Sequence, residues 1–111
     1  MRLTLPFPPS VNNLFLNVRG RGRVPSARYR AWRKRADDSM WGQKIEAVSG
    51  PVQIQITYED QGRCDLDNLQ KAILDHLVHH RLIDGDDRAV VRKITLQWGA
   101  VQGAVIDVAP A

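Results

Sequence analysis

The sequence predicts an α+β fold in which two helices pack on one face of a small mixed sheet. Two observations predict it: apolar and polar residues alternate strictly over residues 52–58, and two segments, residues 26–48 and 68–80, have helical periodicity. Shorter alternating segments near both ends of the chain add further strands. The predicted order is strand, helix, strand, helix, strand, strand. At this length the chain is expected to form a single domain over residues 1–111.

The first half of the chain contains one predicted strand and one predicted helix. Leu3 and Leu5 alternate with polar neighbours, which favours a short strand, and the prolines that follow end it. Residues 10–22 contain asparagine and glycine pairs typical of a loop. Ser26 is the expected N-cap of a helix that continues to about Val48. Its apolar face is expected to contain Tyr29, Trp32, Ala36, Met40 and Ala47.

The second half contains three predicted strands and the second helix. Residues 52–58 predict a strand whose even-numbered residues face the core. The helix is expected over residues 68–80, and a further strand over residues 89–98. Residues 104–108 are expected to return beside that strand as its hairpin partner. The residues expected to face the core here are Leu69, Ile73, Leu77, Val90, Ile94, Leu96 and Trp98.

Charge is unevenly distributed along the chain. The first 36 residues carry nine basic side chains and no acidic one, whereas the remaining residues carry seven basic and all twelve acidic side chains. A basic segment on a mildly acidic body predicts a polyanionic partner, and nucleic acid fits best. The alternative is an ordinary solvated helix face. The basic residues of this segment are Arg2, Arg19, Arg21, Arg23, Arg28, Arg30, Arg33, Lys34 and Arg35.

The sequence also indicates a cellular compartment. Cys64 is the only cysteine, so no disulfide forms within the chain, which fits a reducing cytoplasm. No apolar run approaches the roughly 18 residues of a membrane span. The N-terminus has no apolar segment followed by a small-residue cleavage site, as a secretory signal would have. We therefore expect a cytoplasmic protein without a membrane partner.

Acidic residues in the middle of the chain predict a metal site. Asp65 and Asp67 are two residues apart, so their carboxylates point the same way in an extended segment. Carboxylates held this close repel one another unless a cation, a proton or water separates them. Two or three of them suffice to bind Mg²⁺. Lys71 follows one helical turn after Asp67, and a metal with a lysine beside it predicts chemistry on a phosphodiester.

A third ligand could come from the acidic cluster of Asp84, Asp86 and Asp87, which precedes a predicted strand. The alternative role of these residues is structural. Asp67 and Gln70 form a capping-box pattern at the start of the second helix, and clustered aspartates also suit a turn. From the residues alone, both roles remain open.

Other features indicate no site. His76 and His80 are four residues apart, a spacing compatible with zinc, but no acidic or cysteine partner stands in clear register, so a solvated helix end is favoured. Cys64 has no indicated base, and Gly20 and Gly22 lack the strand-to-helix context of a phosphate loop. No organic cofactor is expected.

Taken together, these motifs resemble the RusA family of Holliday junction resolvases, endonucleases common in phages and prophages. The matching segments are residues 5–13, the arginine-rich segment through Arg35, residues 65–71 and residues 86–91. They occur in the family's order without a large gap, and residues 65–71 are the most specific. In one difference, Cys64 stands directly before the first aspartate, where family members often have a basic residue.

The resemblance implies a homodimer that binds four-way junction DNA and nicks two strands symmetrically, using Mg²⁺ or Mn²⁺. It implies that Asp65, Asp67 and Asp87 bind the metal. It also implies that Lys71 contacts phosphate or takes part in catalysis, with Asn68 beside it. The residues expected to contact DNA are Arg19, Arg21, Arg23, Arg28, Arg63, Asn68 and Lys71.

Two other functions are compatible with the same sequence. One is a non-catalytic protein that binds four-way junctions or duplex DNA, in which the aspartates only cap and turn the chain. The other is a protein-interaction module whose arginines meet an acidic partner. The intact acidic residues and Lys71 favour the endonuclease, since no structural role requires all of them.

Overall fold

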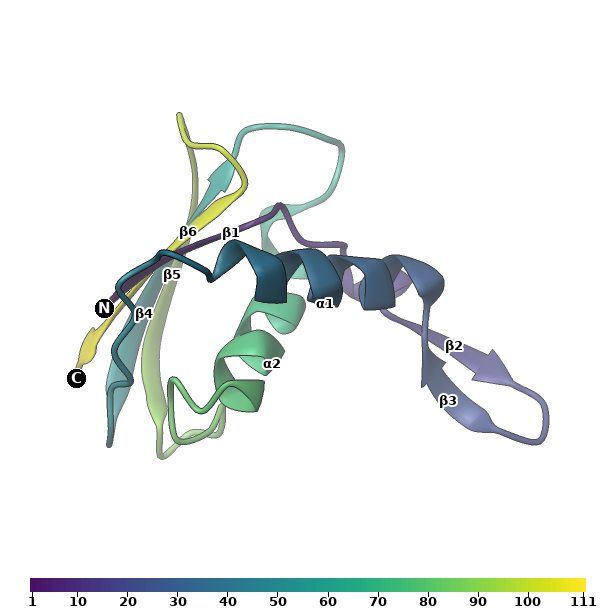
Figure 1. Ribbon diagram of the computed structural model, residues 1–111, viewed down its shortest axis with the longest axis horizontal. Helices are drawn as coiled ribbons and strands as arrows, with labels where there is room; N and C mark the ends of the chain where they lie inside the picture. The colour runs from purple at the N-terminus through teal and green to yellow at the C-terminus, as the bar shows by residue number, and fades with distance from the viewer.

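A computed structural model describes residues 1–111, with six strands, two α-helices and two 3-10 turns (Figure 1). None of the helices combines the length and the apolar character needed to cross a membrane. The strands are β1 (Arg2–Leu5), β2 (Phe15–Val18), β3 (Gly22–Pro25), β4 (Val52–Glu59), β5 (Val91–Gly99) and β6 (Ala104–Pro110). The helices are α1 (Ala27–Ser39) and α2 (Gln70–His79), and the 3-10 turns are η1 (Val11–Asn13) and η2 (Leu66–Asn68).

Four strands form the main sheet, in the order β1-β6-β4-β5. β6 pairs antiparallel with β1 and with β4, whereas β4 and β5 run parallel. Both helices lie on one face of this sheet (Figure 1). The predicted mixed sheet with two helices on one face is confirmed.

The predicted hairpin between β5 and β6 is wrong, because β4 lies between these two strands. β6 buries Ala104, Ile106 and Val108, whereas β5 exposes Arg92 and Lys93. The more apolar strand therefore takes a central position in the sheet. The charged strand stays at the edge, where its charges oppose pairing with further strands. β5 joins β4 in parallel through the crossover that contains α2.

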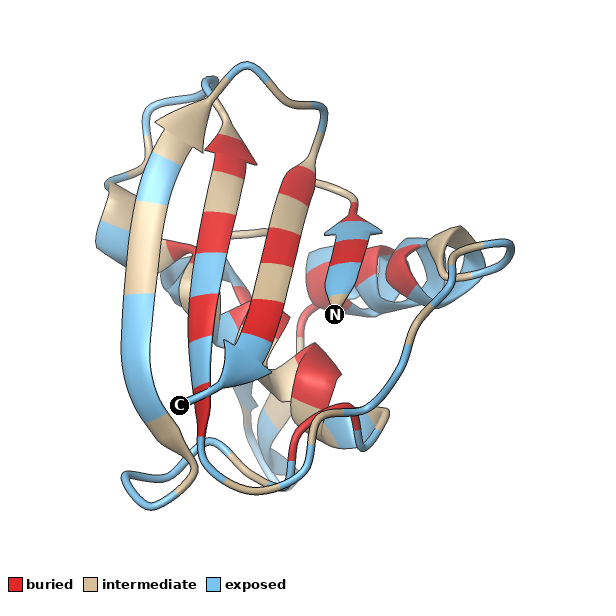
Figure 2. Cartoon of the chain, turned by 90° about the vertical axis from the view of Figure 1, so that its left-hand side faces the viewer, coloured by how far each residue is buried: buried red, intermediate tan, exposed pale blue.

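The core lies between the sheet and the helices. Alternate residues of β4 and β6 are buried (Figure 2), as the period of two in a strand requires. The predicted core residues of the helices are also buried, with the exception of those beyond the end of α1. In β5, Ile94 is 38% exposed because that strand is at the edge of the sheet. The helical core residues are Tyr29, Trp32, Ala36, Ala72, Ile73 and Leu77, with Leu69 just before α2.

α1 begins as predicted but ends early. The N–H of Tyr29 donates to Ser26 Oγ at 3.0 Å, which confirms the predicted N-cap. The helix ends at Ser39, shortly before Gly42, which has a φ of 81°. Glycine adopts this left-handed conformation readily, and it commonly follows a helix end. Ala47, expected on the buried face of a longer helix, is exposed.

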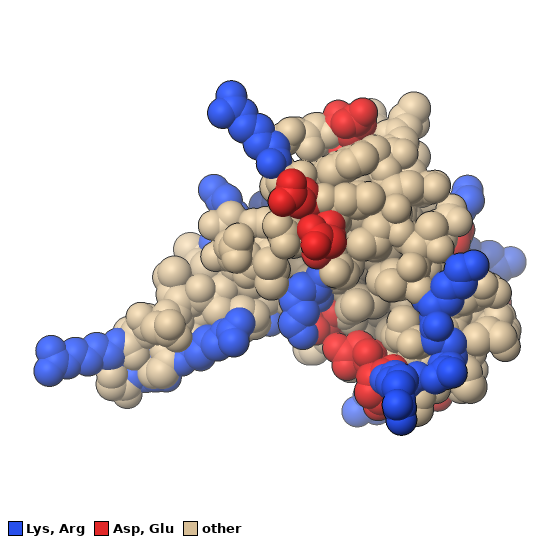
Figure 3. Space-filling model, turned by 180° about the vertical axis from the view of Figure 1, so that it is seen from behind, with Lys and Arg blue, Asp and Glu red and all other residues tan.

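Residues 15–25 form a hairpin of β2 and β3, most of which lies in the predicted loop of residues 10–22. This hairpin, which we call the arm, projects away from the sheet and helices (Figure 1). The Phe15 ring packs edge-on against Tyr29 with centroids 5.6 Å apart, and the Arg23 guanidinium lies 4.4 Å from the Phe15 centroid. Figure 3 shows basic side chains along the arm and at its tip.

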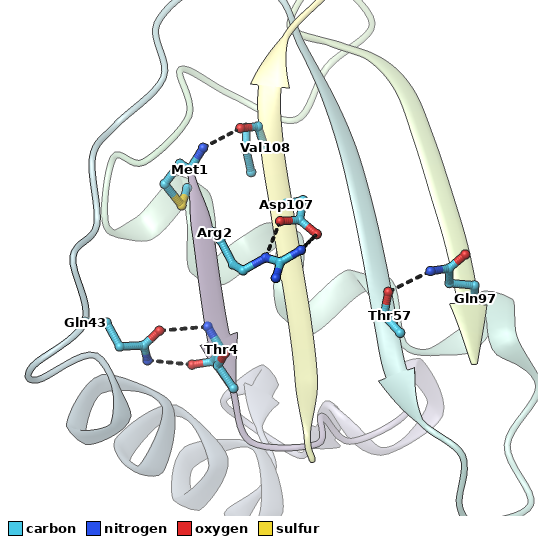
Figure 4. A network of polar contacts seen from close by, with 8 residues as sticks. All are labelled: Met1, Arg2, Thr4, Gln43, Thr57, Gln97, Asp107 and Val108. Atoms are coloured by element: carbon cyan, nitrogen blue, oxygen red, sulfur yellow. Dashed lines mark hydrogen bonds and ion pairs between the residues drawn. The ribbon is translucent and has the colours of Figure 1, made fainter. Parts of the chain in front are cut away.

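The sheet face opposite the helices carries a polar network (Figure 4). Arg2 Nε donates to Asp107 Oδ1 at 2.7 Å across β1 and β6. Gln43 binds the outer edge of β1: its Oε1 accepts the Thr4 N–H at 2.8 Å, and its Nε2 donates to the Thr4 carbonyl at 2.8 Å. The Gln43 amide thus satisfies backbone groups that an edge strand leaves unpaired.

Candidate functional site

The acidic motif lies at η2, directly before α2. Asp65 precedes this turn in an extended conformation and Asp67 lies within it, and both are exposed. Asn68 ends the turn, with its N–H bonded to the Asp65 carbonyl at 3.1 Å. The predicted cap by Asp67 is wrong: α2 begins at Gln70, and the residue before it is Leu69, which makes no side-chain cap. Both carboxylates are therefore available to a ligand from outside the chain.

Two of the three clustered aspartates have backbone partners. Asp84 Oδ2 accepts the Gly50 N–H at 2.8 Å, so this carboxylate holds the segment that leads into β4. Asp87 Oδ1 accepts the N–H groups of Ala89 and Val90 at 2.9 and 3.2 Å. This fixes the Asp87 side chain in the turn before β5 and leaves its Oδ2 without a hydrogen bond.

Lys71 lies in the first turn of α2, close to the acidic motif in sequence. Its Nζ donates to Asp75 Oδ1 at 2.9 Å, one turn further along the helix. This hydrogen bond is the main cause that raises the pKa of Lys71, and the negative charges of Asp75 and Asp86 add to it. Lys71 therefore stays protonated at physiological pH, and the charge of Asp86 acts on it.

The predicted metal ligands do not converge in this structure. η2 packs beside β5, the strand that follows Asp87 in the chain. The ligand atoms of Asp65, Asp67 and Asp87 nevertheless do not all lie within 4.8 Å of one another. The metal site formed by these three residues stays a prediction.

A basic groove adjoins the motif through Cys64. A hollow of about 430 Å³ lies between the proline-rich start and α1, and Arg28 and Arg35 line it. Arg28 is among the predicted DNA contacts, but Arg35 is not. The spacing of seven residues between them could have indicated Arg35, because residues two helical turns apart share a face. The complete lining is Phe7, Pro8, Pro9, Ser10, Asn13, Arg28, Trp32, Arg35 and Cys64.

Comparison with known proteins identifies the family. Residues 6–109 match the family described as Endodeoxyribonuclease RusA. The chain belongs to the RusA family. The resemblance stated from the acidic and proline-rich motifs is confirmed.

Relatives support this assignment over part of their length. The crossover junction endodeoxyribonuclease RusA of Enterobacteria phage 82 is 40% identical over 78 residues, which are 68% of this chain and 64% of that protein. The protein of the same name from Escherichia coli strain K12 has the same identity and coverage. That of Shigella sonnei strain Ss046 is 38% identical over the same length. The match therefore spans less than two thirds of the relatives' chains.

In this RusA family chain, the arginines predicted to contact DNA lie on three elements. Arg19 and Arg21 are at the tip of the arm, Arg28 is on α1, and Arg63 is in the loop before the acidic motif. All of these side chains are exposed, as is Arg23 on β3. On the face shown in Figure 3, acidic side chains gather on the body next to the base of the basic arm. A bound polyanion would therefore meet both charges within one surface.

A second cluster joins residues that the sequence does not connect. Asp37, in the last turn of α1, meets His76 and His80 at the end of α2. The sequence indicates no acidic partner for these histidines and so argues against a metal there. That expectation is wrong, because Asp37 is such a partner. The pKa of His76 is lowered to about 4, chiefly by burial and also by His80 and His79, against the opposing charge of Asp37. His76 is therefore neutral at physiological pH.

Proposed function

We propose that this chain is a metal-dependent endonuclease that cuts four-way DNA junctions by paired, symmetric nicks and acts as a homodimer in DNA recombination and repair. The observation that carries the proposal is the pair of exposed carboxylates, Asp65 and Asp67, one turn before the protonated Lys71 in a RusA family chain. Relatives named crossover junction endodeoxyribonucleases support the same activity here.

The acidic motif fits a hard divalent cation such as Mg²⁺, with Mn²⁺ as a substitute. All candidate ligands are carboxylate oxygens, which these cations prefer. The carboxylates of Asp65 and Asp67 make no helix-capping hydrogen bond that metal binding would break. Asp87 Oδ1 accepts backbone N–H groups, whereas its Oδ2 has no hydrogen bond. A bound cation would supply Lewis-acid activation of a phosphodiester.

Lys71 would contribute positive charge beside the phosphate that is cut. Its side chain is 48% exposed, and its partner Asp75 is 28% exposed. Exposed ion pairs contribute little stability, so Lys71 can exchange Asp75 for a phosphate oxygen at small cost. A charge held in place before the reaction stabilises the negative charge that develops on phosphate during it.

The basic groove and the arm would hold the DNA backbone near the acidic motif. Arginine side chains bind phosphate with parallel N–H donors and contribute affinity independent of base sequence. A four-way junction has two-fold symmetry, which a symmetric dimer matches by placing one acidic motif at each of two strands. This arrangement would produce paired nicks.

Cleavage of a labelled four-way junction in the presence of Mg²⁺ tests the proposal. We expect Asp67→Asn to lose cleavage by at least about 100-fold while junction binding is retained or strengthened, because a negative charge near phosphate is removed. Asp60→Asn is the matched control, since Asp60 is an exposed aspartate outside the motif. If Asp67→Asn cuts as well as the parent, the proposed mechanism is wrong.

The same assay identifies the third acidic residue. Asp87→Asn is expected to lose cleavage, whereas Asp86→Asn, whose charge acts on Lys71, is expected to retain most of it. The reverse result would assign the metal to Asp86 in place of Asp87.

The lack of convergence of the three carboxylates favours one alternative, a protein that binds junctions or duplex DNA without cutting them. Such a protein would bind the labelled junction but show no nicking at any Mn²⁺ concentration. Its affinity would also not depend on divalent cations.

A further inference from the structure

The C-terminal ends of α1 and α2 meet at a cluster of potential metal ligands. Asp37 comes from α1, and His76 and His80 are four residues apart at the end of α2. One ligand atom from each residue lies within 4.8 Å of the other two. No other group of three or more histidine, cysteine, aspartate or glutamate residues in the chain comes this close.

The distances in this cluster are near those of a metal site. His80 Nε2 lies 2.7 Å from Asp37 Oδ1, and His76 Nδ1 lies 4.0 Å from the same oxygen. The two imidazole rings have centroids 4.4 Å apart. A tetrahedral zinc ion, with ligands at about 2.0–2.2 Å, places those ligand atoms roughly 3.4 Å from one another. Small side-chain rotations therefore bring the three atoms to the required separation.

His76 has few hydrogen-bond partners for a buried imidazole. Its side chain is only 3% exposed, yet its Nε2 contacts Met40 Sδ at 3.1 Å, and a thioether is a weak acceptor. Its Nδ1 makes no hydrogen bond and lies 4.0 Å from Asp37 Oδ1. Histidines that bind a metal through one nitrogen usually donate the other N–H to a neighbour. His76 fits that arrangement if Nδ1 binds the metal and Nε2–H donates to Met40 Sδ.

We propose that Asp37, His76 and His80 bind a divalent transition-metal ion of the Zn²⁺ class, at a site separate from the acidic motif. Imidazole nitrogen suits zinc and its neighbours in the first transition row, whereas Mg²⁺ prefers oxygen ligands. A hollow of about 190 Å³, lined in part by Asp37, His76 and His79, adjoins the cluster and leaves room for a water molecule as fourth ligand.

The ion would link the two helices that carry the proposed DNA-binding and cleaving residues. α1 carries the arginines of the basic groove, and α2 begins with Lys71 beside the acidic motif. The three ligands are brought together only by folding, so binding of the ion stabilises the folded chain. A metal at this site therefore fixes the basic groove relative to the acidic motif.

Titration of the untagged full-length chain, stripped with a chelator, tests the site. We expect one Zn²⁺ per chain by calorimetry, a higher unfolding temperature with Zn²⁺, and a visible absorption band with Co²⁺ in its place. A large excess of Mg²⁺ is not expected to displace Zn²⁺, because the ligand set contains two nitrogens.

Variants separate this site from other binding modes. His80→Gln and Asp37→Asn, which change partly exposed side chains, are expected to weaken Zn²⁺ binding by at least roughly tenfold. Asp38→Asn, the matched control at the exposed aspartate beside Asp37, and Asp67→Asn in the acidic motif are expected to bind Zn²⁺ as the parent does. Absence of Zn²⁺ binding by the parent, or equal losses in Asp38→Asn and Asp37→Asn, would overturn the proposal.

Discussion

At the scale of single residues, the three aspartates between α2 and β5 meet different atoms despite their identical chemistry. Asp84 holds the backbone N–H of Gly50, and Asp87 holds those of Ala89 and Val90. Asp86 makes no side-chain hydrogen bond, and its charge adds to the causes that raise the pKa of Lys71. The position of each carboxylate relative to nearby backbone donors, which composition does not reveal, determines whether it is free to bind a ligand.

Tyr58 gives a prediction about stability. Its side chain is fully buried at the end of β4, and its hydroxyl has no hydrogen-bond partner; burial raises its pKa far above the usual range. An unpaired buried hydroxyl costs free energy, so Tyr58→Phe is expected to raise the free energy of unfolding by about 1 kcal/mol. Urea unfolding measures this change. Tyr29→Phe, whose hydroxyl is not a buried unpaired group, should change stability little; a loss of stability in Tyr58→Phe would indicate a missed partner.

His76 gives a prediction about pH. Its pKa falls from 6.5 to about 4 on folding, because of burial and the charges of His80 and His79, against the opposing charge of Asp37. The unfolded chain therefore binds more protons between these values, so stability falls as pH is lowered from about 6.5 toward 4, by up to about 3 kcal/mol. Urea unfolding in chelator at a series of pH values measures the slope. His76→Gln should flatten it; an unchanged slope would assign the effect to other groups.

At the scale of elements, the arm is a hairpin that local sequence patterns do not predict. β2 and β3 are short strands, and the turn between them contains Gly20, a residue typical of a loop. Such a pattern predicts irregular structure unless the flanking residues pair. Here the contact of Phe15 with Tyr29 anchors the base of the hairpin, and it joins residues from different elements. Gly42 is a local signal for the early end of α1. The prediction misses it because apolar periodicity alone does not take helix-ending residues into account.

The arm also carries a prediction about salt dependence. Replacing Arg19 and Arg21 at its tip with glutamine is expected to weaken junction binding and to make the slope of log affinity against log salt shallower by about 2, because each phosphate contact contributes close to one unit. Fluorescence anisotropy over a range of KCl concentrations measures both effects.

A matched control removes the same number of positive charges from residues outside the arm. Lys44→Gln combined with Arg81→Gln removes two positive charges from the segments after α1 and α2. This double variant should leave the slope nearly unchanged. An equal change in both double variants would show that overall charge, and not the arm, determines the salt dependence.

At the scale of the whole molecule, sequence reasoning succeeds where a pattern is local and misses what depends on distant pairing. The alternation over β4 predicts a strand, and a strand forms there. The central position of β6 depends on its pairing with β1, near the other end of the chain. In the same way, Asp37 lies beside His76 only because α1 and α2 end next to each other. The separation of these two residues in the sequence therefore does not predict their contact.

The amide of Gln43 on Thr4 has a consequence for how copies of this chain can associate. It occupies the outer edge of β1 as an added strand would, so this side of the sheet is closed to further strands. The other side, β5, has an unpaired backbone edge, and its exposed Arg92 and Lys93 oppose pairing there. One edge of the sheet is thus protected by an amide and the other by charge. Copies of this chain are therefore kept from joining edge to edge into an extended sheet.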